Sequence, residues 1–203
     1  MSTQTHWDQT YATKAETQVS WFQASPEPSL GLIRSAAPSH SPSIIDVGGG
    51  ASRLVDSLLA DGYSDLAVLD VSEVALSRSK ARLGELASKV SWIVADMTDW
   101  QPRKKWNVWH DRAVFHFLTD EAAQDAYITA LKQGTATGST VLMATFALNG
   151  PERCSGLPVC RYSPATLALK LGDDFVLYAE SSETHSTPFG TIQEFSYAGF
   201  RRR

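Results

Sequence analysis

The segment from Ser43 to Ser52, which reads SIIDVGGGAS, places the strongest constraint on how this chain folds. Its first half carries Ile44, Ile45 and Val47, an apolar run that is typical of a buried strand. Three consecutive glycines follow, and glycine adopts positive φ readily and leaves no Cβ between the backbone and a ligand. A strand that ends in glycines and leads into a helix therefore predicts a site where a ligand lies directly against the backbone.

A second apolar run, Leu66–Val71 (LAVLDV), carries the acid Asp70, which follows Gly50 by 20 residues. That distance suits one crossover helix with its turns. An acid at the end of the second strand can accept hydrogen bonds from both hydroxyls of a ribose. The two segments together predict an α/β domain that binds a nucleoside.

Strand and helix patterns alternate along the rest of the chain. The predicted strands are 43–50, 66–71, 90–95, 107–110, 140–146, 175–180 and 191–200, and the predicted helices are 53–59, 72–86 with Leu86 buried, 120–131 and 164–171. The repeats predict a parallel sheet, and the short turn at Thr187–Gly190 joins only antiparallel neighbours, so the final strand should run in reverse. Residues 24–43 hold four prolines and predict a partly irregular lead-in.

Composition narrows the class of protein. The chain has 203 residues, 43% of them hydrophobic, which is enough for one good core. A net charge of −4 argues against nucleic acid or an anionic membrane as a partner, and no apolar run has the length of a membrane span. The N-terminus lacks an apolar signal core, which predicts a cytoplasmic protein. Cys154 and Cys160 are predicted to be free thiols, and the five scattered histidines predict no metal site.

The glycine turn can be compared with the dinucleotide fingerprint G-x-G-x-x-G. Counted from Gly48, it has Gly50 but Arg53 where the last glycine belongs, so the match is partial. Asp46 would also place a negative charge near a pyrophosphate. An acid at that position suits a cationic ligand better, and S-adenosylmethionine is such a ligand.

At these residues the chain resembles the class I S-adenosylmethionine-dependent methyltransferases. The motif D-x-G-x-G-x-G is matched by Asp46, Gly48 and Gly50, with Ser52 in place of the last glycine, and the resemblance extends from about Ser43 to Phe200. It implies an α/β fold, a Rossmann-like doubly wound seven-stranded sheet, mostly parallel with a reversed final strand. By similarity, the cofactor would contact Trp21, Asp46, Gly48, Gly49, Gly50, Ser52, Asp70 (ribose), Val71, Asp96 and Met97 (adenine) and His110.

The stretch WHDRAVFHF (Trp109–Phe117) follows the fourth predicted strand and concentrates reactive side chains. Its Asp111 and Arg112 resemble the D-R-G-A-L stretch of thiopurine methyltransferase-like enzymes and the D-K-G-T-L stretch of lysine methyltransferases that act on elongation factors. In the same two groups a WDQTY…SWF segment folds over the cofactor, which predicts an aromatic lid in residues 1–42 and a methyltransferase domain in residues 43–203.

Candidate catalytic residues are Asp111, Arg112, His116 and His185, the histidines because their pKa suits proton acceptance. Phe22 and Arg161 are candidate substrate contacts, Arg161 because it lies in the long loop at 149–162.

These patterns favour a methyltransferase that acts on a small molecule, with a thiol or a related soft nucleophile as acceptor, working as a monomer or homodimer. A protein lysine methyltransferase is the first alternative and predicts an open acidic groove. A nicotinamide-dependent oxidoreductase and a non-catalytic nucleoside-binding protein are more distant alternatives. The acceptor atom depends on side chains from separated segments, so the sequence leaves it open.

Overall fold

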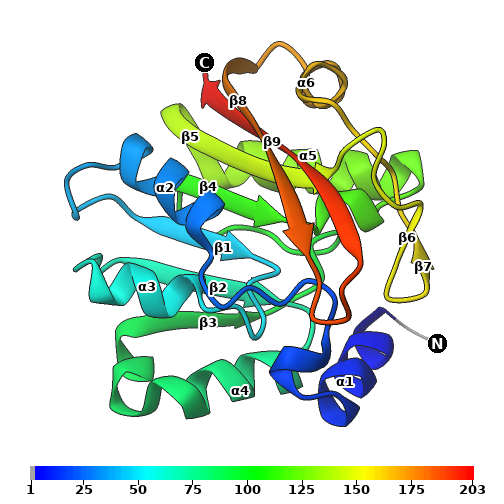
Figure 1. Cartoon of the computed structure of the whole chain (residues 1–203). Coiled ribbons are helices and arrows are strands. Elements are labelled where there is room, and N and C mark those ends of the chain that lie inside the picture. The colour runs from blue at the N-terminus through cyan, green and yellow to red at the C-terminus, as the bar shows by residue number, and fades with distance from the viewer. Residues whose placement is uncertain (1–2) are drawn as a thin grey trace.

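A seven-stranded sheet runs through the centre of the molecule (Figure 1). The computed structural model describes residues 3–203, so Met1 and Ser2 of the predicted 1–42 segment lie outside the described residues. From one edge to the other, the strands are β3 (Val90–Val94), β2 (Leu66–Asp70), β1 (Ile44–Val47), β4 (Trp106–Arg112), β5 (Thr135–Phe146), β9 (Ile192–Arg202) and β8 (Phe175–Ser186).

The direction of the strands matches the prediction from sequence. The strands from β3 to β5 pair in parallel, whereas β9 pairs antiparallel with both β5 and β8. The predicted mostly parallel sheet with a reversed final strand is confirmed. Strand order reverses beside β1, because β2 lies on one side of it and β4 on the other. In open α/β sheets this reversal opens a crevice at the carboxyl ends of the strands.

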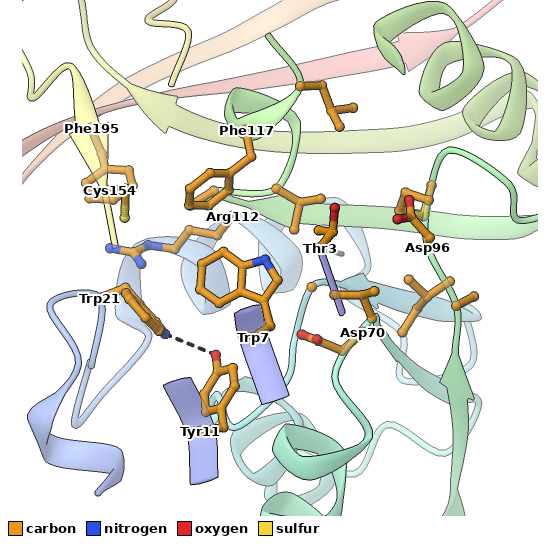
Figure 2. A pocket seen from close by; sticks show the side chains of 18 of the residues that line it. Thr3, Trp7, Tyr11, Trp21, Asp70, Asp96, Arg112, Phe117, Cys154 and Phe195 are labelled. Carbon is orange, nitrogen blue, oxygen red and sulfur yellow. Dashed lines mark hydrogen bonds between the residues drawn. The ribbon is translucent and has the colours of Figure 1, made fainter. Parts of the chain in front are cut away.

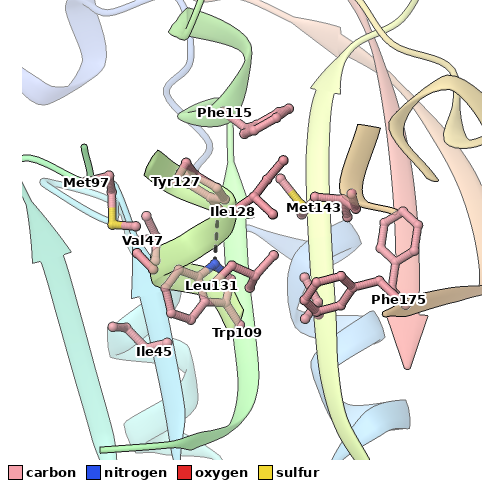
Figure 3. Packing of buried hydrophobic residues seen from close by; sticks show 14 of the residues in the cluster. Ile45, Val47, Met97, Trp109, Phe115, Tyr127, Ile128, Leu131, Met143 and Phe175 are labelled. Atoms are coloured by element: carbon pink, nitrogen blue, oxygen red, sulfur yellow. Dashed lines mark hydrogen bonds between the residues drawn. The ribbon is translucent and has the colours of Figure 1, made fainter. Parts of the chain in front are cut away.

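Alternating side chains on the strands build two apolar layers. Ile45 and Val47 point to the layer shown in Figure 3, and Ile44 points to the opposite layer. The first layer is covered by α5 (Glu121–Gly134) and α6 (Pro164–Leu171), and the second by α2 (Glu27–Ala36), α3 (Leu54–Ala60) and α4 (Glu73–Leu83). Strands buried on both faces explain the continuous apolar runs in the sequence.

Local signals set the starts of α4 and α6 where the sequence predicts them. Ser72 caps α4 by accepting a hydrogen bond from the amide of Ala75 at 3.1 Å. Ser163 caps α6, which has Pro164 at its first position and ends at Gly172 with φ +80°. These caps decide where the helices begin and end, and thereby where the strand ends point.

The predicted partly irregular lead-in at 24–43 contains α2, which buries Leu30 and Ile33 against the sheet. Two expectations from sequence need correction. Leu86 is 44% exposed, since α4 ends at Leu83 and a 3-10 segment, Gly84–Lys89, follows. The 149–162 loop carries a short hairpin of β6 (Arg153–Cys154) and β7 (Leu157–Pro158).

The N-terminal part lies along the carboxyl edge of the sheet, as Figure 1 shows for α1 (Thr3–Thr13) beside α4. A 3-10 turn, Glu16–Gln18, follows α1 and leads the chain back toward α2. Across residues 3–203, no helix combines the length and the apolar character that crossing a membrane requires.

Candidate active site

A cavity of about 130 Å³ lies between the carboxyl edge of the sheet and the N-terminal segment (Figure 2). Its acidic end is formed by strand ends and turns: Gly48, Leu69, Asp70, Val71, Ala95, Asp96 and Met97. Its aromatic end is formed by Trp7, Trp21, Arg112, Phe117, Cys154, Gln193 and Phe195. A side pocket of about 60 Å³ adjoins it and shares Tyr11, Trp21, Gly48 and Arg112 with the cavity.

The three glycines after β1 have no room for side chains. A Cβ on Gly48, whose φ is +68°, would collide with the side chain of Val114, and one on Gly49 would collide with the Asp46 carboxylate. A Cβ on Gly50 would come within 2.7 Å of an Asp70 carboxylate oxygen. The turn thus keeps bare backbone close to two acids, as a ligand held by the backbone requires.

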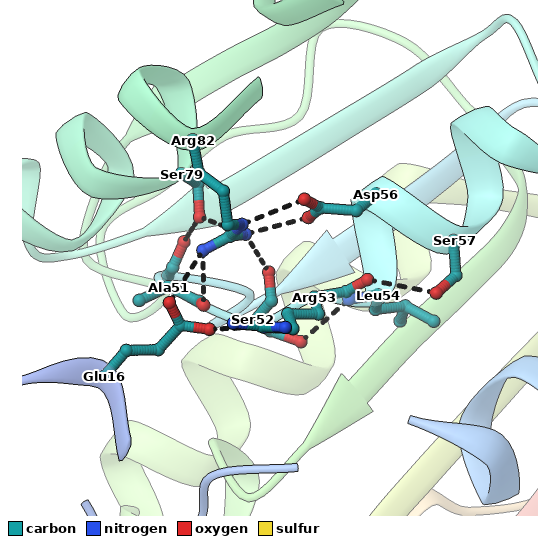
Figure 4. Close-up of polar contacts among 10 residues, drawn as sticks. Glu16, Ala51, Ser52, Arg53, Leu54, Asp56, Ser57, Ser79 and Arg82 are labelled. Atoms are coloured by element: carbon teal, nitrogen blue, oxygen red, sulfur yellow. Dashed lines mark hydrogen bonds and ion pairs between the residues drawn. The ribbon is translucent and has the colours of Figure 1, made fainter. Parts of the chain in front are cut away.

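Two arginines, Arg53 and Arg82, hold the residues that follow the glycine turn (Figure 4). Arg82 donates to the carbonyl oxygens of Ala51 and Ser52 at 3.1 and 2.7 Å and pairs with Asp56 at 2.8 Å. Glu16 pairs with Arg53 at 2.7 Å and with Arg82 at 3.5 Å. The residues after the glycines are therefore tied both to α4 and to the N-terminal segment.

A buried hydrogen-bonded chain lines the side pocket. His110 Nδ1 lies 2.7 Å from a carboxylate oxygen of Asp46, and His110 Nε2 lies 2.8 Å from the hydroxyl of Ser29 on α2. All three side chains are buried. The chain fixes the orientation of Asp46, which leaves its other oxygen beside the glycine turn.

Asp70 ends β2 and lines the acidic end of the cavity. It accepts a hydrogen bond from the amide of Ser72 at 2.8 Å. Burial, together with the nearby carboxylates of Asp46 and Asp8, raises the pKa of Asp70 to about 7, against the effect of the Ser72 amide. A buried carboxylate with this little compensation is suited to accept hydrogen bonds from a ligand.

Asp8 links α1 to this end of the cavity. Its carboxylate accepts a hydrogen bond from the Ser72 hydroxyl at 2.6 Å and a longer one from the Val74 amide at 3.4 Å. Because these groups lie at the N-terminus of α4, Asp8 supplies the negative charge that a helix N-terminus favours. The contact holds the N-terminal segment against the cavity.

At the aromatic end, Arg112 is held by a buried polar network. Its Nε donates to the Tyr197 hydroxyl at 3.0 Å, and its Nη2 pairs with Glu183 at 3.3 Å. Tyr197 also donates to Glu183, at 2.8 Å, and the guanidinium lies 4.1 Å from the centre of the Phe195 ring. The arginine is therefore fixed in place with its charge compensated from the side away from the cavity, because Glu183 does not line it.

Comparisons with known proteins agree with this geometry. Residues 44–138 match the family model described as a methyltransferase domain. The chain is 25% identical over 124 residues to the eEF1A lysine and N-terminal methyltransferase of Mus musculus, which covers 61% of this chain and 16% of that protein. The chain thus spans about a sixth of the length of that relative.

Two solved structures share the fold over almost their whole length. One comes from work on the conversion of a disulfide bond into a thioacetal group during echinomycin biosynthesis; it has a TM-score of 0.78 at 18% identity and covers 98% of this chain and 92% of its own. The other is the N-methyltransferase NodS from Bradyrhizobium japonicum WM9 with S-adenosyl-L-homocysteine, with a TM-score of 0.73 at 16% identity, covering 96% and 97%.

Residues 44–138 therefore match a methyltransferase domain, and the chain as a whole resembles the class I S-adenosylmethionine-dependent methyltransferases. Its cofactor is accordingly S-adenosylmethionine rather than a nicotinamide dinucleotide. The residues present fit that cofactor, because Gly48 of the glycine turn lines both pockets, and the buried acids Asp70 and Asp46 line the cavity and the side pocket.

The structure of this methyltransferase brings most of the predicted cofactor residues together. Trp21, Gly48, Asp70, Val71, Asp96 and Met97 line the cavity, and Asp46, Gly49, Ser52 and His110 line the side pocket. Phe22, the predicted substrate contact, also lines the side pocket. Gly50 lines neither, and its carbonyl oxygen accepts a hydrogen bond from Ser79 at 2.7 Å.

Asp111 lies apart from the cavity, although the sequence placed it among the catalytic residues. Its carboxylate is fully buried and accepts hydrogen bonds from Tyr127 at 2.6 Å and from the amides of Val114 and Phe115 at 2.9 and 3.1 Å. Burial raises the pKa of Asp111 to about 6, against these hydrogen bonds. Through these hydrogen bonds Asp111 holds the turn after β4 and so positions Arg112.

The two predicted histidine bases also lie outside the cavity. His116 is fully buried, and its Nε2 has no hydrogen-bond partner in the described part of the chain. Burial, together with the charge of Arg112, lowers the pKa of His116 to about 3, so the ring stays neutral. His185 donates from Nε2 to the carbonyl oxygen of Ser20 at 2.7 Å and thereby holds the N-terminal segment on β8.

Arg161 serves its own loop instead of the cavity. It donates to the carbonyl oxygen of Gly150 at 3.1 Å and pairs with Glu152 at 3.0 Å. Cys154 and Cys160 are free, as predicted. Burial raises the pKa of Cys154 to about 11, so its thiol is protonated and inert beside the aromatic end.

Sequence reasoning missed Ser29, Gln193 and Phe195 among the residues that line the two pockets. Ser29 comes from α2, in the stretch expected to be partly irregular, and the other two come from β9. The alternation along β9 could have indicated that Gln193, Phe195 and Tyr197 share one face, but not which face meets the cavity.

Proposed function

We propose that this protein transfers a methyl group from S-adenosylmethionine to a small-molecule acceptor that carries a soft or uncharged nucleophile. The observation that carries the proposal is the aromatic end of the cavity, which Trp7 and Trp21 of the N-terminal segment line and which is continuous with the acidic end. Such a site encloses a compact acceptor beside the cofactor.

The acidic end and the side pocket are proposed to hold the cofactor. Asp70 would accept hydrogen bonds from the ribose hydroxyls, and Asp96 and Met97 would contact the adenine. The glycine turn and Asp46 would hold the methionine part of the cofactor. Ser29 and His110 would orient the carboxylate of Asp46. The four residues shared by the cavity and the side pocket then surround the reacting centre.

When bound, the cofactor supplies a methyl group on a positively charged sulfur, which the lone pair of an acceptor can displace in line. The side chains of this protein would align the acceptor and exclude water, and alignment alone can contribute roughly 7–11 kcal/mol in favourable cases. Trp7 packs edge-on against Trp21 and Phe117, with ring centres 5.6 and 5.1 Å apart, and this packing covers the site.

The type of acceptor follows from the side chains that the cavity offers. Among the described residues that line it, the carboxylates Asp70 and Asp96 lie at the acidic end, and no histidine or lysine is present. The aromatic end thus provides no evident general base. An acceptor whose lone pair is available at neutral pH, a thiol or an uncharged amine, needs none, whereas an alcohol would need one.

Protein lysine methylation is a second candidate, because the mouse relative is a lysine and N-terminal methyltransferase. The aromatic end weakens this candidate. No carboxylate lines it among the described residues, so nothing at this end would compensate the charge of an incoming ammonium group. A lysine side chain on a protein surface would also have to pass the N-terminal segment.

Calorimetric titration with S-adenosylmethionine, S-adenosylhomocysteine and NAD⁺ is the first test, on the wild-type protein and on Asp70→Ala. We expect the first two to bind wild type, with affinity lost in the variant. Release of S-adenosylhomocysteine is then measured with thiophenol, aniline, phenol and a lysine peptide. Turnover with the thiol or the amine supports the proposal, and turnover with the peptide alone replaces it with the second candidate.

Two further expectations remain proposals with simple tests. A monomer or homodimer is expected, and sedimentation equilibrium of the purified protein distinguishes either from a larger assembly. A cytoplasmic protein is expected, and fractionation of the source cells followed by immunoblotting would detect it in the soluble fraction or elsewhere.

A further inference from the structure

Gln193 brings an unsatisfied polar group to the aromatic end of the cavity. It lies on β9, paired in register with His185 on β8, and its side chain is 8% exposed and lines the cavity. Its carbonyl oxygen has no hydrogen-bond partner among residues 3–203. A buried amide oxygen without a donor is costly, so the site is complete only when something donates to it.

No residue in the described part of the chain donates to this oxygen. Arg112 directs Nε to Tyr197 and Nη2 to Glu183, and the indole N–H of Trp21 donates to Tyr11 at 3.2 Å. The other residues at this end are Trp7, Phe117, Cys154 and Phe195, and none of them makes a hydrogen bond to the oxygen. The other unpartnered buried atoms of the described chain, in Trp106, His116 and Thr145, do not line the cavity.

We infer that Gln193 selects the acceptor by accepting a hydrogen bond from it. This inference rests on the proposed function and specifies its substrate class. The acceptor has an apolar, ring-sized body that fits among the aromatic side chains, and it carries an N–H donor next to that body. It is uncharged, because no carboxylate among the described residues lines this end to compensate an ammonium group.

The chemistry distinguishes between the two soft acceptors left open above. An S–H group is a weak hydrogen-bond donor, whereas the N–H of an uncharged aromatic amine is a good one. A site that presents a buried oxygen therefore favours the amine, since the analogue that lacks the donor leaves the oxygen unpaired. Gln193 is in this sense a specificity-determining residue and takes no proton from the acceptor.

Binding of benzene and aniline to the complex with S-adenosylhomocysteine tests the inference without turnover. The two probes share a ring and differ in the N–H donor, and ligand-observed NMR titration measures both affinities. We expect wild type to bind aniline about tenfold more tightly than benzene. Gln193→Leu should remove the preference, and Gln193→Glu should retain it, because an accepting oxygen remains.

Gln133→Leu is the matched control, because Gln133 is an exposed residue near the end of α5 and the chemical change is the same. It should keep the wild-type preference. Equal binding of the two probes by wild type, or a preference for aniline that survives in Gln193→Leu, overturns the inference. If calorimetry still shows that S-adenosylhomocysteine binds, the proposed function stands. Failure of wild type to bind S-adenosylhomocysteine overturns both.

Discussion

The acidic end of the cavity is built from the ends of neighbouring strands and from backbone turns, whereas the aromatic end is built from side chains of separate segments. The first uses β1, β2 and the turn after β3, which lie side by side in the sheet. The second joins the N-terminal segment, the turn after β4, the β6 hairpin and β9. The sheet itself thus fixes the acidic end, while the aromatic end depends on how the surrounding segments pack.

The two ends also differ in how far their charged side chains are compensated by neighbouring groups. Asp70 has a raised pKa because burial and neighbouring acids leave it poorly compensated. Arg112 is instead paired with Glu183 and covered by Phe195. A carboxylate that lacks a cationic partner and an arginine whose charge is already paired should respond differently to substitution, and the predictions below use this difference.

Asp70→Asn is expected to have the largest effect, confined to the acidic end. Removal of the charged acceptor should weaken S-adenosylhomocysteine binding by at least about 100-fold, since hydrogen bonds to a charged group are worth about 1.5–3 kcal/mol each. Calorimetry measures this loss. Asp99→Asn, an exposed acid on the neighbouring turn, is the control.

The same variant should be more stable than wild type without cofactor. The folded pKa of Asp70 is about 7, above its ordinary value of 3.8, so the native state holds the extra proton between these pH values. Wild-type stability therefore falls as pH rises from about 4 to 7, by at most about 4 kcal/mol, and the variant escapes that loss. Denaturant unfolding at pH 5 and pH 8 checks this. If the free energies of unfolding of the two proteins differ by the same amount at both pH values, burial of the Asp70 charge does not destabilise the wild-type fold.

How far sequence can predict the two ends follows from the same difference. The glycine turn and Asp70 belong to local patterns with a fixed spacing, and the caps at Ser72 and Ser163 mark the helix starts. Sequence therefore predicted the sheet and most residues of the acidic end. Asp111 looked reactive because it adjoins Arg112, but alternation on a strand turns adjacent side chains to opposite faces, and one of the two was bound to point into the core.

The residues of the aromatic end could not be predicted from local sequence patterns, because tertiary packing brings them together. Gln193 and Phe195 are ordinary strand residues until β9 is inserted beside β5 with a definite register. His185 and Arg161 are polar residues in plausible loops, yet backbone carbonyl oxygens nearby use their donors. Burial and hydrogen-bond partners decide these cases, and both depend on the folded chain.

Tyr127→Phe tests the buried hydrogen bonds that hold Asp111, the residue next to Arg112 on β4. The Tyr127 hydroxyl donates to Asp111 at 2.6 Å and accepts from the indole of Trp109 at 3.0 Å. Its loss should reduce the free energy of unfolding by about 2 kcal/mol, because two buried groups lose a partner.

The loss in Tyr127→Phe should depend on pH. Because the folded pKa of Asp111 is about 6, above the ordinary 3.8, wild-type stability falls as pH rises through this range. Without the tyrosine the pKa rises further, so the loss should be larger at pH 8 than at pH 4. Tyr178→Phe, on a half-exposed ring, should cost little at either pH. A loss that is equal at pH 4 and pH 8 would contradict the role assigned to Asp111.

Phe195→Leu is expected to act at the aromatic end alone. It removes the ring under the Arg112 guanidinium and part of the apolar wall, each worth about 0.5–1 kcal/mol. Aniline should bind the S-adenosylhomocysteine complex about five to ten times more weakly. Binding of S-adenosylhomocysteine itself should change less than about twofold. An equal loss for both ligands would show that the two ends are not independent.

Glu16→Gln should have the smallest effect, and it tests how the N-terminal segment joins the two ends. Glu16 pairs with Arg53 and Arg82, the same arginines that adjoin the residues after the glycine turn, and its side chain is 25% exposed. Partly exposed ion pairs are worth about 1 kcal/mol or less and weaken with salt. Dissociation of S-adenosylhomocysteine, followed by stopped-flow tryptophan fluorescence, should be about two to three times faster in the variant at low salt.

That difference in dissociation rate should disappear near 1 M salt, where the Debye length is about 3 Å and the wild-type ion pairs are screened as well. Glu85→Gln, on an exposed 3-10 turn, should release the ligand at the wild-type rate under both conditions. If Glu16→Gln instead releases ligand at the wild-type rate at low salt, the segment is held by Asp8 and the aromatic contacts alone. The acidic and aromatic ends would then be coupled through packing of Trp7 and Trp21, and charge would play no part in closing the site.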